Sequence, residues 1–306
     1  MNKYTVIVFG GSGFLGSHVV DSLYEDGHRV KVFDIKANPH LCDNRAEMII
    51  GDIMDFDEVV KACKDCDMVY NFAGIADIND AMNRPLDTVR LNVLANVNIL
   101  EGARLAGAKR FIFASSVYVY SDSGLFYRVS KQASEGFVVA YEEHYGLKFT
   151  ILRYGSIYGR RADMRNGIYR LLYDAIKDGR ISYPGNGNEI RDYIHVQDAA
   201  KASVDVLSSE YANQHVILTG NERMKVRDMM LMISEMLKGD IKIEFTNKED
   251  SVHYAITPYS FQPTLGKKLI VNPHIDLGQG IMDCLAELHE KLSKDGCVQE
   301  DGIARD

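Results

Sequence analysis

The stretch YTVIVFGGSGFLGSHVV, residues 4–20, decides the fold class of this chain. A short apolar run leads directly into glycines, and a stretch with apolar residues at helical spacing follows them. The glycines satisfy G-x-G-x-x-G through Gly11, Gly13 and Gly16, and G-x-x-G-x-x-G when the pattern starts at Gly10. Glycine permits a tight turn and lets the backbone approach a pyrophosphate at a helix N-terminus, where N–H groups and the helix dipole favour anions. The stretch therefore predicts a strand, a dinucleotide-binding loop and a helix.

A carboxylate at the end of the second apolar run supports this prediction. Asp34 follows RVKVF and lies 18 residues after Gly16, close to the spacing of dinucleotide-binding sites. A carboxylate there accepts hydrogen bonds from the adenosine ribose and repels a 2′-phosphate, so we expect NAD rather than NADP. Lys36 weakens that preference slightly, and an ordinary turn role for Asp34 is the alternative.

Two later turns fit the same ligand. GDIMD places Asp52 after the third strand, where an adenine edge can be read, and NFAG places Ala73 and Gly74 after the fourth. Small residues are needed where the backbone approaches a cofactor. Taken alone, both turns also fit ordinary turn chemistry.

The rest of the first half alternates between strands and helices. The expected strands are 4–9, 29–33, 46–50, 68–72, 110–115 and 148–153, and the expected helices are 13–26, 56–63, 85–106 and 127–145. Strands separated by helices indicate a Rossmann-type, doubly wound parallel sheet.

The alternation loosens after the sixth expected strand, which indicates a second domain. We expect an NAD-binding domain at 1–154, to which later segments can return, and a smaller mixed α/β lobe at 155–294. That lobe should lie beyond the carboxyl ends of the strands, where doubly wound folds bind their ligands. The polar end, 295–306, is expected to be a flexible tail.

A second motif carries the chemistry. Tyr127 and Lys131, in YRVSK, share one face of a helix. An ammonium and a positive nicotinamide ring both favour the phenolate, so Tyr127 can take an alcohol proton while hydride leaves the carbon. Lys131 would also hold the cofactor ribose, and Ser116, at the end of the fifth strand, would bind the same substrate oxygen. Because the chain has 17 tyrosines, the spacing also recurs by chance at Tyr173 and Lys177, where we expect only a helix surface.

Composition excludes several other classes of protein. The net charge of −8 argues against nucleic-acid binding,, and no apolar run approaches the ~20 residues of a membrane helix. The apolar run before the glycines is too short for a secretory signal. Five cysteines at irregular spacing favour the reducing cytoplasm,. Cys63 and Cys66 form a lone C-x-x-C, for which we expect a structural role, and no metal site is expected.

Nine segments in order resemble the extended short-chain dehydrogenase/reductases, which are NAD-dependent nucleotide-sugar epimerases, dehydratases and dehydrogenases. They are the glycine loop, Asp34, GD at 51–52, NFAG, LNVLANVNILEGAR, RFIFASSVYVY, YRVSKQASE, LRYGSIYG and GNGNEIRDYIHVQDAA. The resemblance runs from residue 4 to about 207. It implies a Rossmann domain, a C-terminal lobe that binds a nucleotide-diphosphate sugar, and oxidation at C4 of that sugar. The run is also similar to bacterial capsule polysaccharide enzymes that act on GDP-linked heptoses.

The resemblance assigns residues to the two ligands. Arg191, in RDYIHV, matches a residue that contacts the diphosphate, and its planar fork suits that group; a surface arginine paired with Asp192 is the alternative. The cofactor-binding residues are expected to be Gly10, Gly13, Phe14, Leu15, Asp34, Ile35, Asp52, Ile53, Phe72, Ala73, Gly74, Tyr127, Lys131 and Tyr154. The substrate-binding residues are expected to be Ser116, Ser156 and Arg191.

Three departures from the family pattern bear on the substrate. Val117 and Tyr118 stand where dehydratases carry acidic residues, so dehydration is not expected. Ser156 replaces an asparagine that helps to hold the diphosphate. Only six residues separate Tyr120 from Tyr127, a span of at most about 20 Å, where the family has a much longer segment. We expect a more open pocket there, one that admits a larger sugar such as a heptose.

Two functions follow, and a third is disfavoured. The first is a 4-dehydrogenase that releases a 4-keto sugar, and the alternative is a 4-epimerase that returns hydride to the opposite face. A catalytically dead NAD sensor would keep the glycine loop and lose the tyrosine or lysine, whereas this chain keeps Ser116, Tyr127 and Lys131.

The helices expected at 85–106 and 127–145 are apolar on more than one face. In the family that the chain resembles, these two helices pair between subunits. We therefore expect a homodimer or homotetramer.

Overall fold

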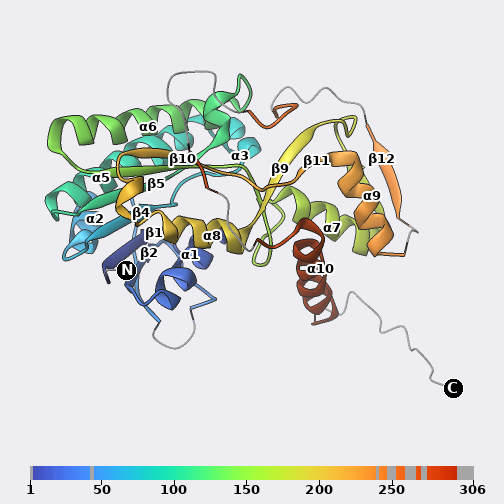
Figure 1. Cartoon of the computed structure of the whole chain (residues 1–306), viewed down its shortest axis with the longest axis horizontal. Coiled ribbons are helices and arrows are strands. Elements are labelled where there is room, and N and C mark those ends of the chain that lie inside the picture. Colours follow the sequence, from blue (N-terminus) through green and yellow to red (C-terminus); the bar gives the residue numbers. More distant parts are fainter. Residues whose placement is uncertain are drawn as a thin grey trace.

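The computed structural model describes residues 3–41, 45–238, 241–246, 253–258, 267–269 and 274–294. The tail expected at 295–306 lies outside these residues. Figure 1 shows a sheet flanked by helices and a smaller lobe beside it. Among the described residues, no helix combines the length and the apolar content that crossing a membrane requires.

The sheet confirms the Rossmann-type expectation. Its eight strands run in the order β3-β2-β1-β4-β5-β6-β10-β13, and every neighbouring pair is parallel. The order reverses between β1 and β4, which is the switch point where such sheets bind ligands. The strands are β1 (Thr5–Phe9), β2 (Arg29–Asp34), β3 (Ala46–Ile50), β4 (Met68–Asn71), β5 (Arg110–Ser116), β6 (Phe149–Tyr154), β10 (Gln214–Leu218) and β13 (Lys267–Lys268).

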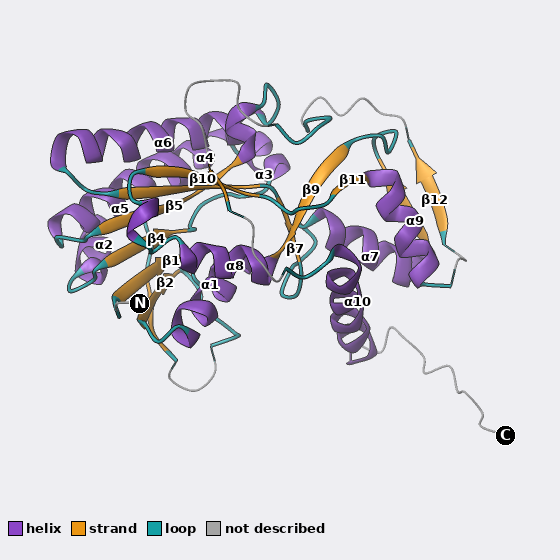
Figure 2. Ribbon diagram, viewed as in Figure 1, coloured by secondary structure: helices purple, strands orange, loops and turns teal. Residues whose placement is uncertain are grey.

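Helices cover both faces of this sheet, as Figure 2 shows. Within β1, Val6 and Val8 belong to one core and Ile7 and Phe9 to the other, because successive strand residues point to opposite faces,. The first core lies under α1 (Phe14–Glu25) and α8 (Val196–Asp205), and the second under α2 (Phe56–Cys63), α5 (Ala95–Leu105) and α6 (Leu125–Tyr145). The central strands are therefore apolar along their whole length.

The helix expected at 85–106 differs in detail. It is α4 (Pro85–Thr88), a π-helical segment η1 (Val89–Leu94) and α5 in continuous succession. A short helix before it, α3 (Ile78–Asn83), was not predicted. A 3₁₀ turn, η2 (Val117–Tyr120), follows β5 directly.

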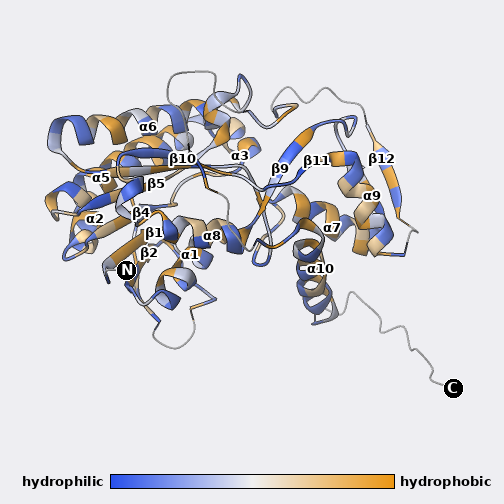
Figure 3. Ribbon diagram, in the orientation of Figure 1, coloured by the Kyte–Doolittle hydropathy of each residue, from blue (hydrophilic) through white to orange (hydrophobic). Residues whose placement is uncertain are grey.

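The second lobe has its own core and its own small sheets. One sheet orders β7 (Ser156–Tyr158), β9 (Ile190–His195) and β11 (Arg223–Lys225), and the other pairs β8 (Arg180–Tyr183) with β12 (Lys242–Phe245). Around them pack α7 (Gly167–Asp178), α9 (Val226–Met236) and α10 (Leu277–Lys294). In Figure 3, α10 carries both hydrophilic and hydrophobic residues, as expected of a helix that covers a core,.

The chain does not stay in this lobe once it has entered it. The sequence places HVILTG in the second lobe, but β10 pairs with β6 and extends the main sheet. The helix before it, α8, packs against α1. A 3₁₀ turn, η3 (Ser209–Tyr211), connects α8 to β10. The range 196–218 therefore belongs with the main sheet.

A buried ion pair fixes α6 to the sheet. Arg153 of β6 donates to both carboxylate oxygens of Glu135, at 3.0 and 2.5 Å, and the two side chains are only 4% and 10% exposed. Ser115 of β5 donates to the same carboxylate at 2.5 Å. One carboxylate thus ties a helix to two adjacent strands.

Glu135→Gln should therefore destabilise the fold strongly. The neutral amide leaves the Arg153 guanidinium buried without a counter-charge, which costs about 3–5 kcal/mol. Asp163→Asn is the control, because Asp163 and its partner Arg165 are 54% and 71% exposed and the loss should stay below about 1 kcal/mol. Urea unfolding of both variants measures the difference, and equal losses would contradict the role given to Glu135.

Candidate active site

The glycine loop lies at the carboxyl ends of β1, β2 and β4. Gly10 adopts a φ of 76°, and its N–H donates to the Phe33 carbonyl at 2.9 Å. A Cβ there would lie 2.6 Å from the Ala73 nitrogen, so this position requires glycine,. Gly13 is the N-cap residue of α1, and no side chain caps that helix end. The backbone is thus closely packed at Gly10, and the first N–H groups of α1 have no intrahelical partner, which fits the pyrophosphate of NAD,.

The Asp34 side chain is hydrogen-bonded to the glycine loop. Its carboxylate accepts hydrogen bonds from the Ser12 nitrogen at 3.0 Å and the Lys36 nitrogen at 3.3 Å. Asn38 adds a second tie, because its side-chain amide donates to the Gly11 carbonyl at 2.9 Å. The end of β2 and the glycine loop therefore form one unit, at the place where a ribose would bind.

The residues expected at the adenine end divide by exposure. Ile35 is 64% exposed and Asp52 is also exposed, whereas Ile53 packs in the core at 8%. One Asp52 oxygen accepts a hydrogen bond from the Met54 nitrogen at 2.9 Å. Ile35 and Asp52 are thus open to a ligand, and contact with the Ile53 side chain is not favoured. Phe14 and Leu15 are the first two residues of α1, directly after the glycines.

The NFAG turn is held by a residue that the sequence analysis missed. Gly74 has a φ of 131°, and a Cβ there would lie 2.5 Å from the Asn92 oxygen. That oxygen accepts from the Ile75 nitrogen at 2.7 Å, and the Asn92 amide donates to the Ile75 carbonyl at 3.0 Å and to Ser130 at 2.9 Å. Asn92 lies in η1, so the π-helical segment joins the cofactor turn to α6. Its only signal in the sequence was a polar residue inside an apolar helix.

Phe72 and Ala73 extend this turn from β4. The Phe72 nitrogen donates to the Phe9 carbonyl at 2.9 Å, and the Ala73 nitrogen donates to the Asn71 side chain at 3.0 Å. Both residues therefore lie beside the glycine loop, as expected.

Ser116, Tyr127 and Lys131 come together at the end of β5. All three are buried, at 7%, 8% and 8% exposure, and Ser116 lies close enough to Tyr127 to lower the pKa of its phenol. The Lys131 ammonium lies 5.9 Å from the centre of the Tyr127 ring and donates to the Ala114 carbonyl at 2.8 Å. The structure thus assembles the three groups that the motif predicted.

The electrostatics of this group differ from the expectation. Burial raises the pKa of Tyr127 to about 12, although the nearby Ser116 lowers it. Burial also lowers the pKa of Lys131 to about 8, against the attraction of Glu135. In the chain without its cofactor, desolvation therefore outweighs the groups that favour the phenolate, and the lowering of the tyrosine pKa by Lys131 together with a nicotinamide ring stays a prediction.

Two further residues expected to bind the ligands, Tyr154 and Ser156, lie in β6 and β7. The Tyr154 phenol lies 2.6 Å from the Ser203 hydroxyl in the core, so its side chain points away from the cofactor. Only its carbonyl, which accepts from Ser116 at 3.5 Å, faces the site. Ser156 is the first residue of β7, beside Tyr193 of β9.

Arg191 is not the surface arginine of the alternative interpretation. It is 7% exposed, and its guanidinium carbon lies 4.4 Å from the centre of the Tyr254 ring. Asp192 instead pairs with Arg223 at 3.4 Å. Contact of Arg191 with a diphosphate stays a prediction.

The short connection before Tyr127 is anchored by α6 and β6. Tyr120 accepts a hydrogen bond from Arg153, whose guanidinium also lies 4.5 Å from the centre of its ring. Arg128 donates to the Ser121 carbonyl at 2.8 Å and Gln132 to the Val119 carbonyl at 2.9 Å. Side chains of α6 thus replace the support that a longer loop would supply.

The second tyrosine–lysine pair has a different setting. Lys177 donates to the Tyr173 hydroxyl at 3.1 Å on α7, where the lysine is exposed. No strand ending in serine precedes this helix among the described residues. The pair therefore lies on a helix surface in the second lobe.

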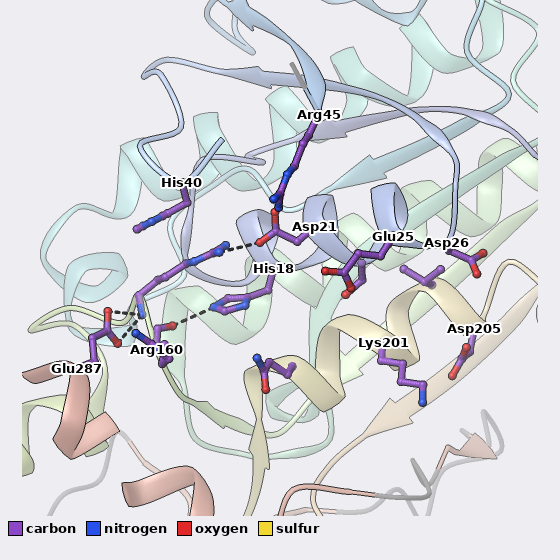
Figure 4. A pocket seen from close by; sticks show the side chains of 14 residues that line it. His18, Asp21, Glu25, Asp26, His40, Arg45, Arg160, Lys201, Asp205 and Glu287 are labelled. Atoms are coloured by element: carbon purple, nitrogen blue, oxygen red, sulfur yellow. Dashed lines mark hydrogen bonds and ion pairs between the residues drawn. The ribbon is translucent and has the colours of Figure 1, made fainter. Parts of the chain in front are cut away.

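A cavity of about 810 Å³ lies elsewhere, between α1, α8 and α10 (Figure 4). Arg161 pairs there with Asp21 at 2.7 Å, and its nitrogen donates to the Glu287 carboxylate at 3.0 and 3.1 Å. His18 contacts the Arg160 carbonyl at 3.0 Å, and burial lowers the pKa of its imidazole to about 4. The lining of this cavity includes none of the residues expected to bind cofactor or substrate. The ion pair between Arg161 and Asp21 instead joins the two lobes.

Cys63 and Cys66 belong to the second core, the one under α2, α5 and α6. Burial raises the pKa of both thiols, which keeps them protonated. Among the described residues, no three histidine, cysteine or acidic side chains gather as metal ligands would.

Comparisons of the sequence identify relatives along most of the chain. A family model described as the NAD dependent epimerase/dehydratase family matches residues 6–220. The putative UDP-glucose 4-epimerase of Methanocaldococcus jannaschii is 29% identical over 299 residues, which cover 90% of this chain and 95% of that protein. The UDP-N-acetyl-alpha-D-glucosaminuronate decarboxylase of Bacillus cytotoxicus is 26% identical, and the alignment covers 94% of this chain and 98% of that protein.

Solved structures share the fold over nearly the whole chain. The UDP-glucose 4-epimerase of Thermotoga maritima, with UDP-glucose, has a TM-score of 0.80 at 21% identity and covers 94% of this chain and 99% of its own. The UDP-N-acetylglucosamine 4-epimerase of Methanobrevibacter ruminantium M1, with UDP-N-acetylmuramic acid, has a TM-score of 0.81 at 23% identity and covers 95% and 100%. At these identities the likeness establishes the fold.

The lowered pKa of Lys131 predicts a pH dependence of stability in the NAD-free chain. Between pH 8 and 10.5 the unfolded chain keeps a proton that folded Lys131 has lost, so this lysine makes the free energy of unfolding rise with pH. From pH 7 to 9.5 the rise amounts to about 2 kcal/mol. Lys131→Met should lack it, while Lys177→Met, which removes an exposed lysine, should follow the wild type. Urea unfolding of the three proteins at both pH values tests this, and parallel curves for Lys131→Met and the wild type would refute it.

Proposed function

Because the chain belongs to the NAD-dependent epimerase/dehydratase family, we propose that it oxidises C4 of a nucleotide-diphosphate sugar and acts as a 4-epimerase. NAD is its cofactor, as the family description states and the sequence predicted. The observation that carries the proposal is the assembly of Ser116, at the end of β5, with Tyr127 and Lys131, on the helix that Asn92 joins to the NFAG turn. This is the arrangement that alcohol oxidation needs, a base and a hydrogen-bond donor at one oxygen.

The residues of the chain handle the proton of this reaction. Ser116 would bind the C4 hydroxyl, and the Tyr127 oxygen would accept its proton. Bound NAD supplies the hydride acceptor and a positive charge close to both groups. Since burial holds the pKa of Tyr127 near 12 in the free chain, the phenolate would form only when a positive charge offsets that burial. Lys131 would hold the cofactor ribose and keep its charge next to the phenol.

Return of hydride to the sugar is favoured over net oxidation. The sequence alone favoured the 4-dehydrogenase, but relatives that align with 90% or more of this chain include a putative 4-epimerase and a decarboxylase. Both names refer to UDP-linked sugars, so these are the first substrates to test, and GDP-linked sugars, heptoses included, come second. Dehydration stays disfavoured, because Val117 and Tyr118 are not acidic.

Self-association remains part of the proposal. Apolar side chains are exposed on the helices expected to pair between subunits: Leu86, Val89, Leu94, Leu105, Phe126, Val129 and Phe137, at 42–80%. Exposed apolar patches of this kind mark protein interfaces. A homodimer through these helices accounts for their composition.

Product analysis should separate the two reactions. The purified chain is incubated with NAD and UDP-glucose, UDP-N-acetylglucosamine, UDP-glucuronic acid or GDP-mannose, and each product is measured by mass and by its sugar after hydrolysis. We expect one sugar to be converted to its C4 epimer with no change of mass. A mass loss of about 2 Da with accumulation of NADH would instead support the 4-dehydrogenase, and no conversion of any sugar would refute both.

Tyr127→Phe tests the site assignment directly. It removes only the phenolic oxygen, so folding and NAD binding should survive while turnover falls about 10²–10⁴-fold. Tyr173→Phe is the matched control, because its tyrosine also has a lysine four residues later, and it should react at the normal rate. Turnover of the variants with matched circular dichroism is compared. Normal activity of Tyr127→Phe would show that the base lies elsewhere.

A further inference from the structure

A short segment of the second lobe reaches the catalytic residues. Residues 253–258 lie along β9, where the Ile190 nitrogen donates to the Ala255 carbonyl at 2.8 Å and the Thr257 nitrogen donates to the Ile190 carbonyl at 3.2 Å. The Asp192 nitrogen also donates to the Thr257 hydroxyl at 3.0 Å. The segment is therefore fixed to the strand that carries Arg191.

The first two residues of this segment contact the other half of the molecule. His253 Nδ1 lies 2.6 Å from the Tyr118 hydroxyl, and the Tyr254 ring lies 4.5 Å from the Tyr118 ring. Tyr254 also packs beneath the Arg191 guanidinium at 4.4 Å. Tyr118 in turn meets the Tyr127 ring edge to face at 6.0 Å. A continuous row of contacts thus connects the proposed base with the proposed diphosphate-binding arginine.

Tyr118 occupies a decisive place in this row. It follows Ser116 by two residues, and its nitrogen donates to the Ser116 hydroxyl at 3.3 Å. Tyr118 contacts Tyr127 on one side and Tyr254, which packs under Arg191, on the other, so a sugar that bridges Tyr127 and Arg191 would pass close to Tyr118. A tyrosine hydroxyl can donate one hydrogen bond and accept two, so it can bind a sugar hydroxyl while it stays bonded to His253.

We propose that the Tyr118 hydroxyl binds a polar substituent next to C4 of the sugar, and that His253 is a positioning residue that aims this hydroxyl. The inference rests on the proposed function, because it takes C4 to lie at Tyr127. The pair joins the two lobes, so the sugar would be recognised by a residue of one lobe that a residue of the other orients. A packing role alone would need the Tyr118 ring but not the bond between its hydroxyl and His253.

The test separates the sugar from the nucleotide. The NAD-bound full chain and its variants are titrated by calorimetry with UDP-glucose and UDP, and in parallel with GDP-mannose and GDP. Tyr118→Phe keeps the ring, so it should bind the nucleoside diphosphate as the wild type does and the nucleotide sugar about fivefold more weakly, the loss of one hydrogen bond.

Variants of His253 distinguish positioning from packing. His253→Ala should bind the nucleotide sugar more weakly by a similar factor and bind the nucleoside diphosphate as the wild type does. His253→Asn, whose amide can reach the position of Nδ1, should recover most of the lost affinity. Tyr118→Phe combined with His253→Ala should be no weaker than Tyr118→Phe, because the histidine acts through the tyrosine.

Three outcomes would overturn the inference. Tyr118→Phe could bind the nucleotide sugar normally, or a variant could lose affinity equally for the sugar-free nucleotide, which would indicate packing alone. Either result leaves the proposed function intact if the wild type converts a nucleotide sugar. A wild type that binds neither nucleotide sugar more tightly than its nucleoside diphosphate, and converts none, would overturn the proposed function and this inference together.

Discussion

The carboxylate of Glu135 sets the geometry on which the site depends. It accepts hydrogen bonds from β5 and β6 while it belongs to α6, so the helix cannot slide along the sheet without breaking a buried ion pair. The buried residues of α6 include Tyr127, Lys131 and Glu135, which are spaced by four and lie on one face,. Fixing the third of them over the sheet therefore places the first two over the ends of the strands. Arg153 extends the same anchor to Tyr120.

Burial then decides what these groups do chemically. The same desolvation keeps the phenol of Tyr127 protonated and weakens the ammonium of Lys131, so the free chain is not ready to take a proton. A positive charge in the site opposes the first tendency, because it favours the phenolate where no water competes, whereas it lowers the pKa of Lys131 further. In the proposed reaction, proton transfer would therefore depend on bound NAD. Without NAD, Tyr127 would not take the proton of an alcohol that enters the site.

The sequence predicted the elements that follow local rules. The glycine loop, the six leading strands and Tyr127 with Lys131 were found because strand period, turn chemistry and helical spacing act over a few residues. Asn92, Glu135 and Tyr118 were missed, since each gains its role from a partner far along the chain. The burial of Tyr154 was missed for the same reason, as Ser203 lies 49 residues away. The pKa values of the site were also beyond reach, because desolvation depends on packing that no spacing reveals.

The path of the chain between the lobes has a consequence for how the protein can be cut or moved. The chain enters the second lobe after β6, returns for α8 and β10, leaves again for β11 and α9, and comes back at β13. A fragment that ended at residue 154 would lack the two elements that cover β6, and it would present an open, apolar strand edge to its neighbours. Several connections at the boundary also resist rotation of one lobe against the other better than a single linker would. A movement of one lobe against the other would therefore have to change the conformation of several of these segments at once.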